Sequence, residues 1–566
     1  MASPSRITPD RAVLVGALLA ALVYIQDVRY DFILDDVSLI LLNESITSWR
    51  NWKSAFLTHI FAGRGPAVPL EIVSLHYRPV YKLWQMLNEQ LFGSVPPWWH
   101  LTSLLLHVAV TFLVYQVGVR LLKERWTAAL AALLFAFHPI HVESVVYVTS
   151  STDLLVTLFA LLSFLAYFRF REEGASPLYF AAALISAALA TMSKETAVMF
   201  PWLLVAYEAL REPPAGTTQT WKRFAWTLPF FGVVGAYLAV RTMLFGLNAG
   251  PGPGGSRIAA FVDIPLVLVS YVRNVFWPVR LSFFYPAEWV SQWTIPRGLA
   301  LVLVTVAAVF VWNRYRERSG VRLQLVWTAI LFAPALLGVF AWGREDWVHD
   351  RHMYWASVSV CLIAAAFLTD SRWPAKVPVI ASSVVLAILL IDTGVQVPRF
   401  SDDVTLYTSA LKVAPRSFIA NSYLADTLWT YGRHEEALRE FKITTELAPR
   451  SAGTHERYGA VLAEIGRNDE ARDEYIKALQ WSPRPTEFRA FLLAELAGTE
   501  LKRSEFPEAA GHLSEAVQIS PQALNYHSLL AVALTREGRS KEADEAMRAE
   551  LGIRQRFVQD QHNPSN

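Results

Sequence analysis

Long apolar runs separated by short polar connectors fill most of the first 394 residues of the chain. A helix needs about 20 predominantly apolar residues to cross the hydrocarbon core of a bilayer, with roughly 17 to 25 tolerated. Runs of this kind lie near residues 11–28, 98–120, 127–148, 153–168, 177–192, 196–210, 224–244, 298–313, 324–341, 353–369 and 377–394. The pattern predicts a polytopic membrane bundle of about eleven transmembrane helices, the first of which is retained because no good cleavage site follows it.

The pattern changes near Pro398, after which the sequence is rich in Glu, Arg and Ala and repeats with a fixed period. Pro415, Pro449 and Pro483 are each 34 residues apart, and glycines in the intervening turns keep the same spacing. This period, with a small residue in the turn and an alanine in the second helix, is typical of tetratricopeptide (TPR) helical hairpins. We therefore predict about four TPR repeats, preceded by a half-hairpin at 400–415.

These patterns together predict an all-α protein, with a transmembrane domain at 1–397 and a TPR α-solenoid at 398–566. Stacked hairpins form a concave groove that binds peptides or proteins, so the second domain predicts a protein partner. The formal charge of +2, with basic residues spread over short loops, argues against nucleic-acid binding. The single cysteine, Cys361, lies inside an apolar run, which excludes a disulfide framework and a cysteine zinc site.

The basic residues of the connectors predict the orientation of the chain. Lys and Arg recur at every second crossing, near 120–125, 169–171, 211–223, 314–322 and 372–376. The positive-inside rule places these connectors and the N-terminus in the cytoplasm. With an odd number of spans, the TPR domain falls on the opposite side. We predict a multi-pass protein of a bacterial inner membrane with a periplasmic TPR domain, or of the ER membrane with a luminal one if the chain is eukaryotic.

An acidic pair, Asp35 and Asp36, follows the first apolar run at the expected non-cytoplasmic surface. Low dielectric and mutual repulsion raise the pKa of such a carboxylate, which suits it to act as a general base. The pair is equally able to hold a divalent metal. A simple turn between two helical segments also accounts for it.

Further ionisable residues cluster on the same face, where charge at membrane depth indicates function. Arg78 and Arg351 match the geometry of a phosphate, although snorkelling toward headgroups also explains them. His138, His141 and Glu143 have the spacing of metal ligands, with interhelical hydrogen bonds as the alternative. Lys194 and Glu195 occupy a tight turn, where an exposed ion pair is the alternative, and Asp153 begins the helical run after another turn. The full set of candidates is Asp35, Asp36, Arg78, His138, His141, Glu143, Asp153, Lys194, Glu195 and Arg351.

The order of these motifs resembles a known family. Tyr77-Arg78-Pro79-Val80 is followed by Trp98-Trp99-His100-Leu101 and His107, then by Phe137-His138-Pro139-Ile140-His141-Val142-Glu143, Asp153-Leu154-Leu155 and Ser193-Lys194-Glu195. This series, after an acidic pair in the first loop and before TPR repeats, resembles the transmembrane and TPR-containing O-mannosyltransferases and their bacterial relatives in the GT-C superfamily of glycosyltransferases. The resemblance covers essentially the whole chain.

The resemblance implies an inverting transferase that moves a monosaccharide from a polyprenyl-phosphate donor to a Ser or Thr hydroxyl of a protein. It makes Asp35 the general base and Asp36 its neighbour or an acceptor-positioning residue. Arg78, Lys194 and Arg351 become candidates for neutralising the departing lipid phosphate. The implied partners are the lipid-linked sugar, membrane lipids and an acceptor protein in the TPR groove. No cofactor is implied beyond the divalent metal that the acidic pair is able to hold.

Two other functions compete with this interpretation. An enzyme that transfers or polymerises whole lipid-linked oligosaccharides is expected to gather Arg and His in a late external loop, and the sequence of 245–297 shows no dense cluster of them. A non-catalytic membrane scaffold that displays TPR repeats predicts that the acidic pair is dispensable. A transporter is disfavoured because no inverted repeat is visible.

Overall fold

The computed structural model describes residues 8–62, 76–173, 176–211, 222–246, 257–340, 347–374, 376–483 and 485–562. Over these ranges the chain is mainly helical, as predicted, and it divides into two compact units, Met1–Pro415 and Arg416–Asn566. The division falls after the first predicted half-hairpin, and the domain boundary at 397/398 stays a prediction.

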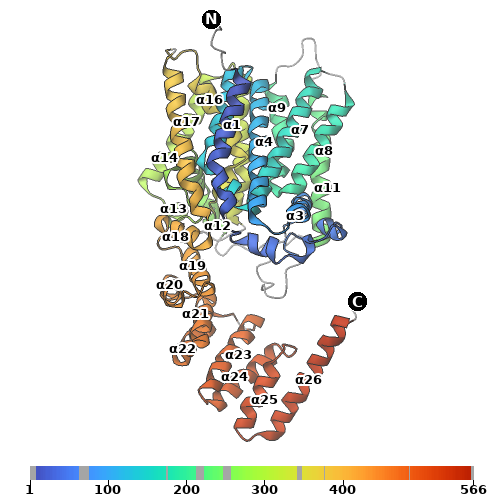
Figure 1. Cartoon of the computed structure of the whole chain (residues 1–566), viewed down its shortest axis with the longest axis vertical. Helices are drawn as coiled ribbons and strands as arrows, with labels where there is room; N and C mark the ends of the chain where they lie inside the picture. Colours follow the sequence, from blue (N-terminus) through green and yellow to red (C-terminus); the bar gives the residue numbers. More distant parts are fainter. Residues whose placement is uncertain are drawn as a thin grey trace. The chain divides into compact units, whose positions relative to one another are not determined.

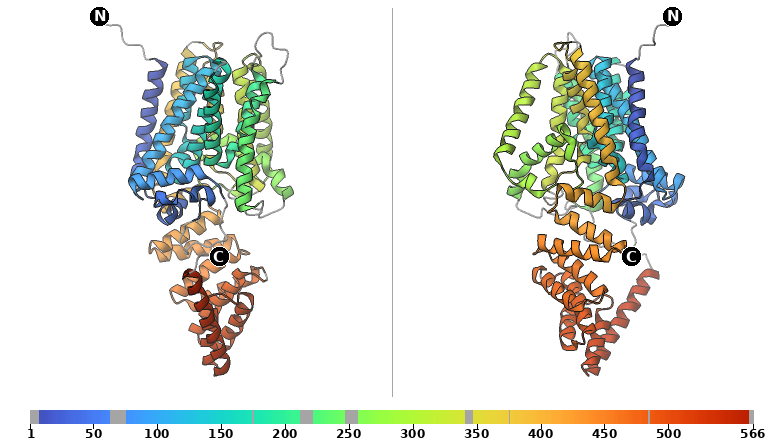
Figure 2. Two further views of the ribbon diagram at one scale, coloured as in Figure 1. Left: turned by 90° about the vertical axis from the view of Figure 1, so that its right-hand side faces the viewer. Right: turned by 60° about the vertical axis from the view of Figure 1, so that its left-hand side comes forward.

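The first unit is a bundle whose main helices run side by side (Figures 1 and 2). Each of the predicted apolar runs forms helix, and these helices carry the polar turns that make up the site. The helices of the unit are α1 Pro9–Tyr24, α2 Ser54–Leu57, α3 Pro79–Phe92, α4 Pro96–Leu122, α5 Arg125–Phe137, α6 Val142–Val146, α7 Ser151–Glu173, α8 Pro177–Ser193, α9 Phe200–Leu210, α10 Lys222–Ala225, α11 Leu228–Phe245, α12 Arg257–Phe276, α13 Ala287–Ser291, α14 Ile295–Arg314, α15 Ser319–Leu337, α16 Ala356–Leu368, α17 Lys376–Gln396 and α18 Asp403–Val413.

Within the described residues, 7 helical stretches are long and apolar enough to cross a membrane, or 8 if the bent pair α5 and Pro139–Val146 is one span. Those stretches are Pro9–Arg29, Pro96–Leu122, Val148–Arg171, Lys222–Phe245, Ile295–Arg314, Ser319–Phe340 and Lys376–Phe400. Helices α8 and α16 are shorter apolar helices, and α9 is shorter still. The structure therefore has fewer full-length spans than the sequence has apolar runs. Polar turns such as Ser193-Lys194-Glu195 interrupt the helices inside the bundle.

The bundle has a protected centre and an exposed edge. Helix α4 packs on both α5 and α7, and α1 packs on α4, α5 and α17. Most of the apolar stretch of α7 is buried, whereas α14 has no buried residue at all. In a membrane, α14 therefore faces lipid along its length. Helix α12 lies in the segment 245–297, for which the sequence predicted a long connector, and it contains Pro265.

The second unit consists of helical hairpins that follow one another along the chain (Figure 1). Gly432, Gly466 and Gly538 have φ of 74°, 79° and 82° in the turns of their hairpins, and Ser504 takes φ 64° at the corresponding place. Glycine adopts this left-handed conformation without steric cost, which explains the periodic small residue. The pairs are α19 Phe418–Thr430 with α20 His434–Leu447, α21 Ala452–Glu464 with α22 Asn468–Trp481, α23 Glu487–Lys502 with α24 Phe506–Ile519, and α25 Tyr526–Arg536 with α26 Ser540–His562.

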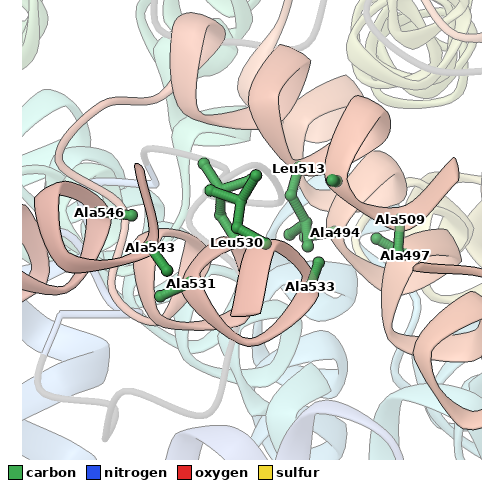
Figure 3. Close-up of a cluster of buried hydrophobic side chains, with 11 residues drawn as sticks. Ala494, Ala497, Ala509, Leu513, Leu530, Ala531, Ala533, Ala543 and Ala546 are labelled. Atoms are coloured by element: carbon green, nitrogen blue, oxygen red, sulfur yellow. The ribbon is translucent and has the colours of Figure 1, made fainter. Parts of the chain in front are cut away.

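The periodic alanines lie where neighbouring helices meet. Ala509 and Ala543, from successive repeats, belong to one buried cluster with Leu513, Leu530 and Leu534 (Figure 3). A small side chain at these positions lets two helices approach closely while the leucines fill the space between hairpins. Each hairpin thus buries its apolar side on the next, as a solenoid requires.

Candidate active site

The acidic pair lies in a tight turn that separates its two carboxylates. Leu34, just before the pair, has φ 51°, and its N–H donates to Oδ1 of Asp403 at 3.0 Å. A non-glycine residue in this conformation is strained by on the order of 1 kcal/mol, and such strain concentrates at functional sites. After this turn the side chain of Asp35 is exposed, whereas Asp36 is completely buried.

Asp36 is fixed by hydrogen bonds. Its Oδ1 accepts from the N–H and the hydroxyl of Thr149, at 2.7 and 2.6 Å, and its Oδ2 accepts from the N–H of Ile33 at 3.4 Å. Burial raises the pKa of Asp36 to about 7, although the hydrogen bonds from Thr149 oppose the rise. The Asp36 side chain therefore ties the first loop to the turn before α7.

Asp35 has the opposite environment. Its side chain forms no hydrogen bond or ion pair with any residue of the described ranges, and only its backbone carbonyl is engaged, by the hydroxyl of Ser38 at 3.1 Å. An exposed carboxylate without a partner is able to approach a substrate hydroxyl. Of the two acidic residues, Asp35 alone has this freedom.

Tyr147 lies within electrostatic range of both the acidic pair and Arg351. Burial raises the pKa of the Tyr147 phenol well above its usual value, and the charges of Asp35 and Asp36 raise it further. Arg351 acts on the same group in the opposite direction. Arg351 contacts Glu143 and Asp36 accepts from Thr149, so the short segment 143–149 connects Arg351 to the acidic pair.

Arg78 and Glu195 form a bidentate ion pair. Nε of Arg78 donates to both carboxylate oxygens, at 3.2 and 3.0 Å, and its terminal nitrogen donates at 2.8 Å. Nδ1 of His76 lies 3.0 Å from Oε1 of the same carboxylate. Burial on its own raises the pKa of Glu195, but Arg78 and His76 outweigh it and hold that pKa well below the usual range. The pair joins the start of α3 to the turn after α8.

Lys194 turns away from its neighbour Glu195 and pairs with Asp153. Its Nζ lies 2.6 Å from both carboxylate oxygens, and the two side chains are 8% and 6% exposed. Burial lowers the pKa of Lys194, Asp153 opposes this, and the charges of Arg78 and Arg351 lower the pKa further. The alternative of an exposed Lys194–Glu195 ion pair is therefore wrong. The turn directs Lys194 to the carboxylate of Asp153 and Glu195 to the guanidinium of Arg78.

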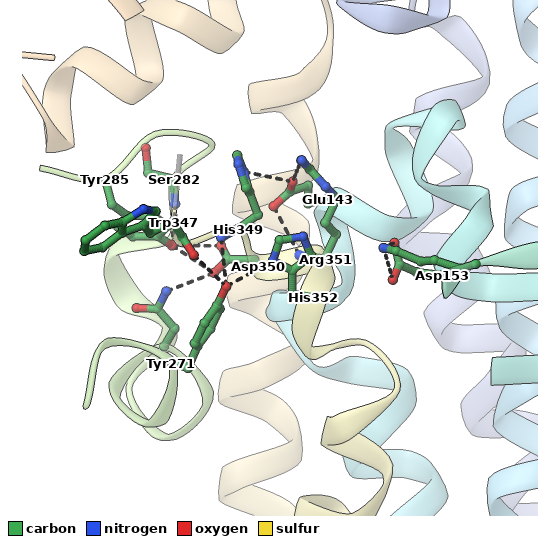
Figure 4. Close-up of polar contacts among 12 residues, drawn as sticks. Glu143, Asp153, Tyr271, Ser282, Tyr285, Trp347, His349, Asp350, Arg351 and His352 are labelled. Carbon is green, nitrogen blue, oxygen red and sulfur yellow. Dashed lines mark hydrogen bonds and ion pairs between the residues drawn. The ribbon is translucent and has the colours of Figure 1, made fainter. Parts of the chain in front are cut away.

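Arg351 pairs with Glu143 in the turn before α16 (Figure 4). Its backbone N–H donates to Oε2 of Glu143 at 3.2 Å, its guanidinium contacts Oε1, and Nδ1 of His349 lies 3.7 Å from Oε1. The guanidinium carbon also lies 5.5 Å from the centre of the Phe283 ring. Glu143 is thus a carboxylate that holds Arg351 in place.

Residues that the sequence candidates did not include complete this region (Figure 4). The hydroxyl of Tyr285 donates to Asp350 at 2.9 and 2.8 Å, and the amide of Asn274 donates to it at 2.9 Å. The hydroxyl of Tyr271 lies 3.1 Å from Nδ1 of His352. Asp350 and His352 are the sequence neighbours of Arg351, and this position could have indicated them as site residues. The other three come from the segment predicted as a connector and carry no motif.

His138 and His141 use both ring nitrogens in hydrogen bonds inside the bundle. Nε2 of His138 lies 2.8 Å from the Val275 carbonyl, and its Nδ1 accepts from the N–H of Ile140. Nδ1 of His141 lies 2.8 Å from the Phe135 carbonyl, and its Nε2 lies 2.7 Å from the Ser357 hydroxyl. The contacts with Val275 of α12 and Ser357 of α16 are interhelical, as in the alternative that the sequence left open, and a role in substrate binding stays a prediction.

Arg78, Lys194 and Arg351 lie within electrostatic range of one another. Burial lowers the pKa of His352 well below its usual value, and Lys194, Arg351, His349 and Arg78 all lower it further. Arg78, Lys194 and Arg351 are each paired with one carboxylate, and the charges of all three act on His352. Over the described residues, no group of three or more His, Cys, Asp or Glu side chains is placed to hold a metal ion. The arrangement suits the binding of an anion, next to an exposed carboxylate.

Comparison with known proteins gives a family model and curated relatives. Residues 77–240 match the model described as dolichyl-phosphate-mannose-protein mannosyltransferase. Protein O-mannosyl-transferase Tmtc2 of Drosophila melanogaster is 33% identical over 201 residues, which cover 34% of this chain and 21% of that protein. Protein O-mannosyl-transferase TMTC4 of Homo sapiens is 26% identical over 503 residues, covering 77% of this chain and 66% of that protein. The match to Tmtc2 thus spans about a fifth of that relative's length.

Solved structures also align with parts of the chain. The oligosaccharyltransferase of Archaeoglobus fulgidus in its apo form aligns with 74% of this chain and 58% of its own, at 13% identity and a TM-score of 0.39. The crystal structure of MamA aligns with 28% of this chain and 89% of its own, at 18% identity and a TM-score of 0.26. The family model and the curated relatives confirm the resemblance to O-mannosyltransferases that the motif series indicated.

Proposed function

We propose that this chain, a GT-C O-mannosyltransferase-like membrane protein, transfers a monosaccharide from a polyprenyl-phosphate donor to a Ser or Thr hydroxyl of a protein. The transfer inverts the anomeric centre and takes place on the non-cytoplasmic side. The observation that carries the proposal is the exposed carboxylate of Asp35, which has no side-chain partner among the described residues and belongs to the loop that Thr149 connects to the segment of Glu143, the partner of Arg351.

In the proposed reaction, Asp35 takes the proton of the acceptor hydroxyl while the hydroxyl oxygen attacks the anomeric carbon. The bond between that carbon and the phosphate oxygen breaks, and the phosphate leaves with the electron pair. Attack from the face opposite the phosphate inverts the configuration. Positioned general bases of this kind accelerate proton transfer by about 10²- to 10⁴-fold.

Asp36 has a positioning role in this scheme. Its hydrogen bonds to Thr149 fix the turn that presents Asp35, and it is completely buried. The Asp36 carboxylate is therefore unable to reach an acceptor without breaking the contacts that hold the loop. This difference supports Asp35 as the base, in line with the implication of the family resemblance.

The cations stabilise the phosphate as its negative charge grows. Arg78 and Arg351 offer guanidinium donors that match phosphate oxygens, while Lys194 contributes a compact charge. Their carboxylate partners Glu195, Glu143 and Asp153 hold them in place before the donor binds. Donors fixed in this way need little reorganisation in the transition state.

The TPR unit is the proposed binding site for the acceptor protein, because stacked helical hairpins form concave surfaces that take extended peptides. We place it on the same side of the membrane as Asp35, in the periplasm of a bacterium or in the ER lumen of a eukaryote. The basic connectors near 120–125, 169–171, 211–223, 314–322 and 372–376 support this orientation.

The test is sugar transfer in membranes that contain the full chain, a panel of labelled polyprenyl-phosphate sugars and exported proteins as acceptors. Wild type is expected to label protein, and Asp35→Asn is expected to abolish the labelling at equal protein levels. Asp31→Asn changes another exposed carboxylate of the same loop and is the matched control. Full transfer by Asp35→Asn would refute the assignment of Asp35 as the base, and equal labelling in membranes that lack the chain would favour the scaffold interpretation.

A further inference from the structure

A basic cleft lies where α12 ends and α14 begins, outside the site described above. Its volume is about 540 Å³. Three arginines and two tryptophans dominate its lining, and the described lining contains no acidic residue. The residues that matter here are Ser270, Arg273, Trp277, Arg280, Trp289 and Arg297.

The three arginines come from different elements but lie around one cleft. The guanidinium of Arg273 lies over the ring of Trp289, with its carbon 4.1 Å from the ring centre. Arg297 donates to the backbone carbonyls of Glu288, at 2.6 Å, and Gln292. Arg280 is exposed. Within the described ranges none of these arginines forms an ion pair with a carboxylate, and only Arg273 is under the influence of one, Asp350. The charges of Arg280 and Arg297 therefore remain available to an anion.

The position of the cleft indicates a membrane surface. Helix α14 is a candidate span without a buried residue, and the cleft opens at its N-terminal end. Trp277 and Ile295 next to the cleft are 68% and 82% exposed. Tryptophans gather at the level of lipid headgroups, and a lipid-facing helix provides an apolar track for a hydrocarbon chain.

We propose that this cleft binds a lipid-borne phosphate, with the lipid's hydrocarbon chain along the exposed surface of α14. Guanidinium forks match phosphate oxygens and form charge-assisted hydrogen bonds with them. Arginines that snorkel extend toward water individually and form no common site. Here Arg273 is held by Trp289 and Arg297 by two carbonyls, so the cleft is built before any ligand arrives.

Helix α12 connects this cleft to the candidate active site. Ser270, Arg273 and Trp277 line the cleft from one face of the helix. From a neighbouring face, Asn274 donates to Asp350 and the hydroxyl of Tyr271 lies against His352 (Figure 4). A helix is about 10 Å across. A phosphate in the cleft would therefore lie about one helix diameter from the residues around Arg351.

The phosphate has two sources, the bilayer phospholipids and a polyprenyl monophosphate. We would purify the full chain in phosphatidylcholine nanodiscs that contain either phosphatidylglycerol or a polyprenyl monophosphate, and count retained lipids by native mass spectrometry. Wild type should retain the anionic lipid, and Arg273→Gln/Arg280→Gln should reduce its affinity by about tenfold or more. Arg316→Gln, which removes an exposed arginine beyond the other end of α14, is the matched control.

The double variant alters the packing on Trp289, so Arg280→Gln alone is the second variant, because Arg280 is exposed and its loss leaves the fold intact. Selective retention of the polyprenyl monophosphate supports a carrier-lipid site, and equal retention of phosphatidylglycerol supports a headgroup site. Retention that is the same in wild type, both cleft variants and Arg316→Gln would overturn the proposal. Sugar transfer is not measured, so the outcome is independent of the proposed function.

Discussion

Removal of Lys194 alone is expected to destabilise the membrane unit, whereas removal of Lys194 together with Asp153 is not. The Nζ of Lys194 lies 2.6 Å from both oxygens of Asp153, and the side chains are 8% and 6% exposed. Breaking a buried ion pair from one side leaves an uncompensated charge and costs about 3–5 kcal/mol. Replacing both partners with apolar residues of similar volume is often neutral.

We therefore expect Lys194→Met to lower the melting temperature of the purified protein in detergent, and Lys194→Met/Asp153→Leu to recover most of the loss. Sugar transfer should not recover in the double variant, because the cation proposed to neutralise the phosphate is still missing. The melting temperature is read from the monodisperse fraction that survives heating. Equal stability of the single and double variants, or recovered transfer in the double variant, would refute this reasoning.

Three other predictions follow from the contacts of the site. The pKa of Asp36 is raised from 3.8 to about 7 in the folded protein. The free energy of unfolding of wild type, measured relative to that of Asp36→Asn, should therefore be highest below pH 4. It should fall by about 4 kcal/mol as pH rises through 7, and a pH-independent difference in unfolding would contradict this. Arg78→Lys should lower transfer by about tenfold, since lysine loses the bidentate contact with Glu195, and unchanged kcat/KM would contradict the assignment. His141→Phe should reduce stability by about 1–3 kcal/mol while donor affinity is kept, and a selective loss of donor binding would instead support a substrate role.

The sequence predicted those features that depend on periodicity. The apolar runs and the 34-residue spacing correspond to helices and to hairpins whose turns take positive φ at Gly432, Gly466 and Gly538. Both signals reflect local physics, the length needed to cross a bilayer and the conformational freedom of glycine. The number of full-length spans was less accessible, because the runs at 177–192 and 196–210 are apolar enough to resemble spans, although the helices they form, α8 and α9, are short.

The pairing of charges could not be predicted in the same way. Lys194 and Glu195 are neighbours in sequence, yet one side chain contacts Asp153 and the other contacts Arg78. The direction of each depends on the backbone of one turn and on where α3 and α7 lie in the bundle. A single sequence contains no signal for that arrangement, although it did indicate these residues as candidates for the site.

The same holds for the acidic pair and for the basic cleft. Asp35 and Asp36 are adjacent carboxylates, and only the left-handed Leu34 and the contact with Thr149 make one exposed and the other buried. Arg280 and Arg297 are separated along a segment whose sequence shows no dense basic cluster, and the fold brings them to one cleft. Tertiary structure, rather than local pattern, determines both features.

The role of Asp35 is tested most directly by a single-turnover measurement. Wild type and Asp35→Asn would be loaded with a saturating polyprenyl-phosphate sugar, mixed with acceptor, and the rate of transfer of the bound sugar followed. We predict a rate lower by about 10²- to 10⁴-fold in Asp35→Asn with the donor affinity unchanged. A wild-type rate in the variant would contradict the assignment of Asp35 as the base.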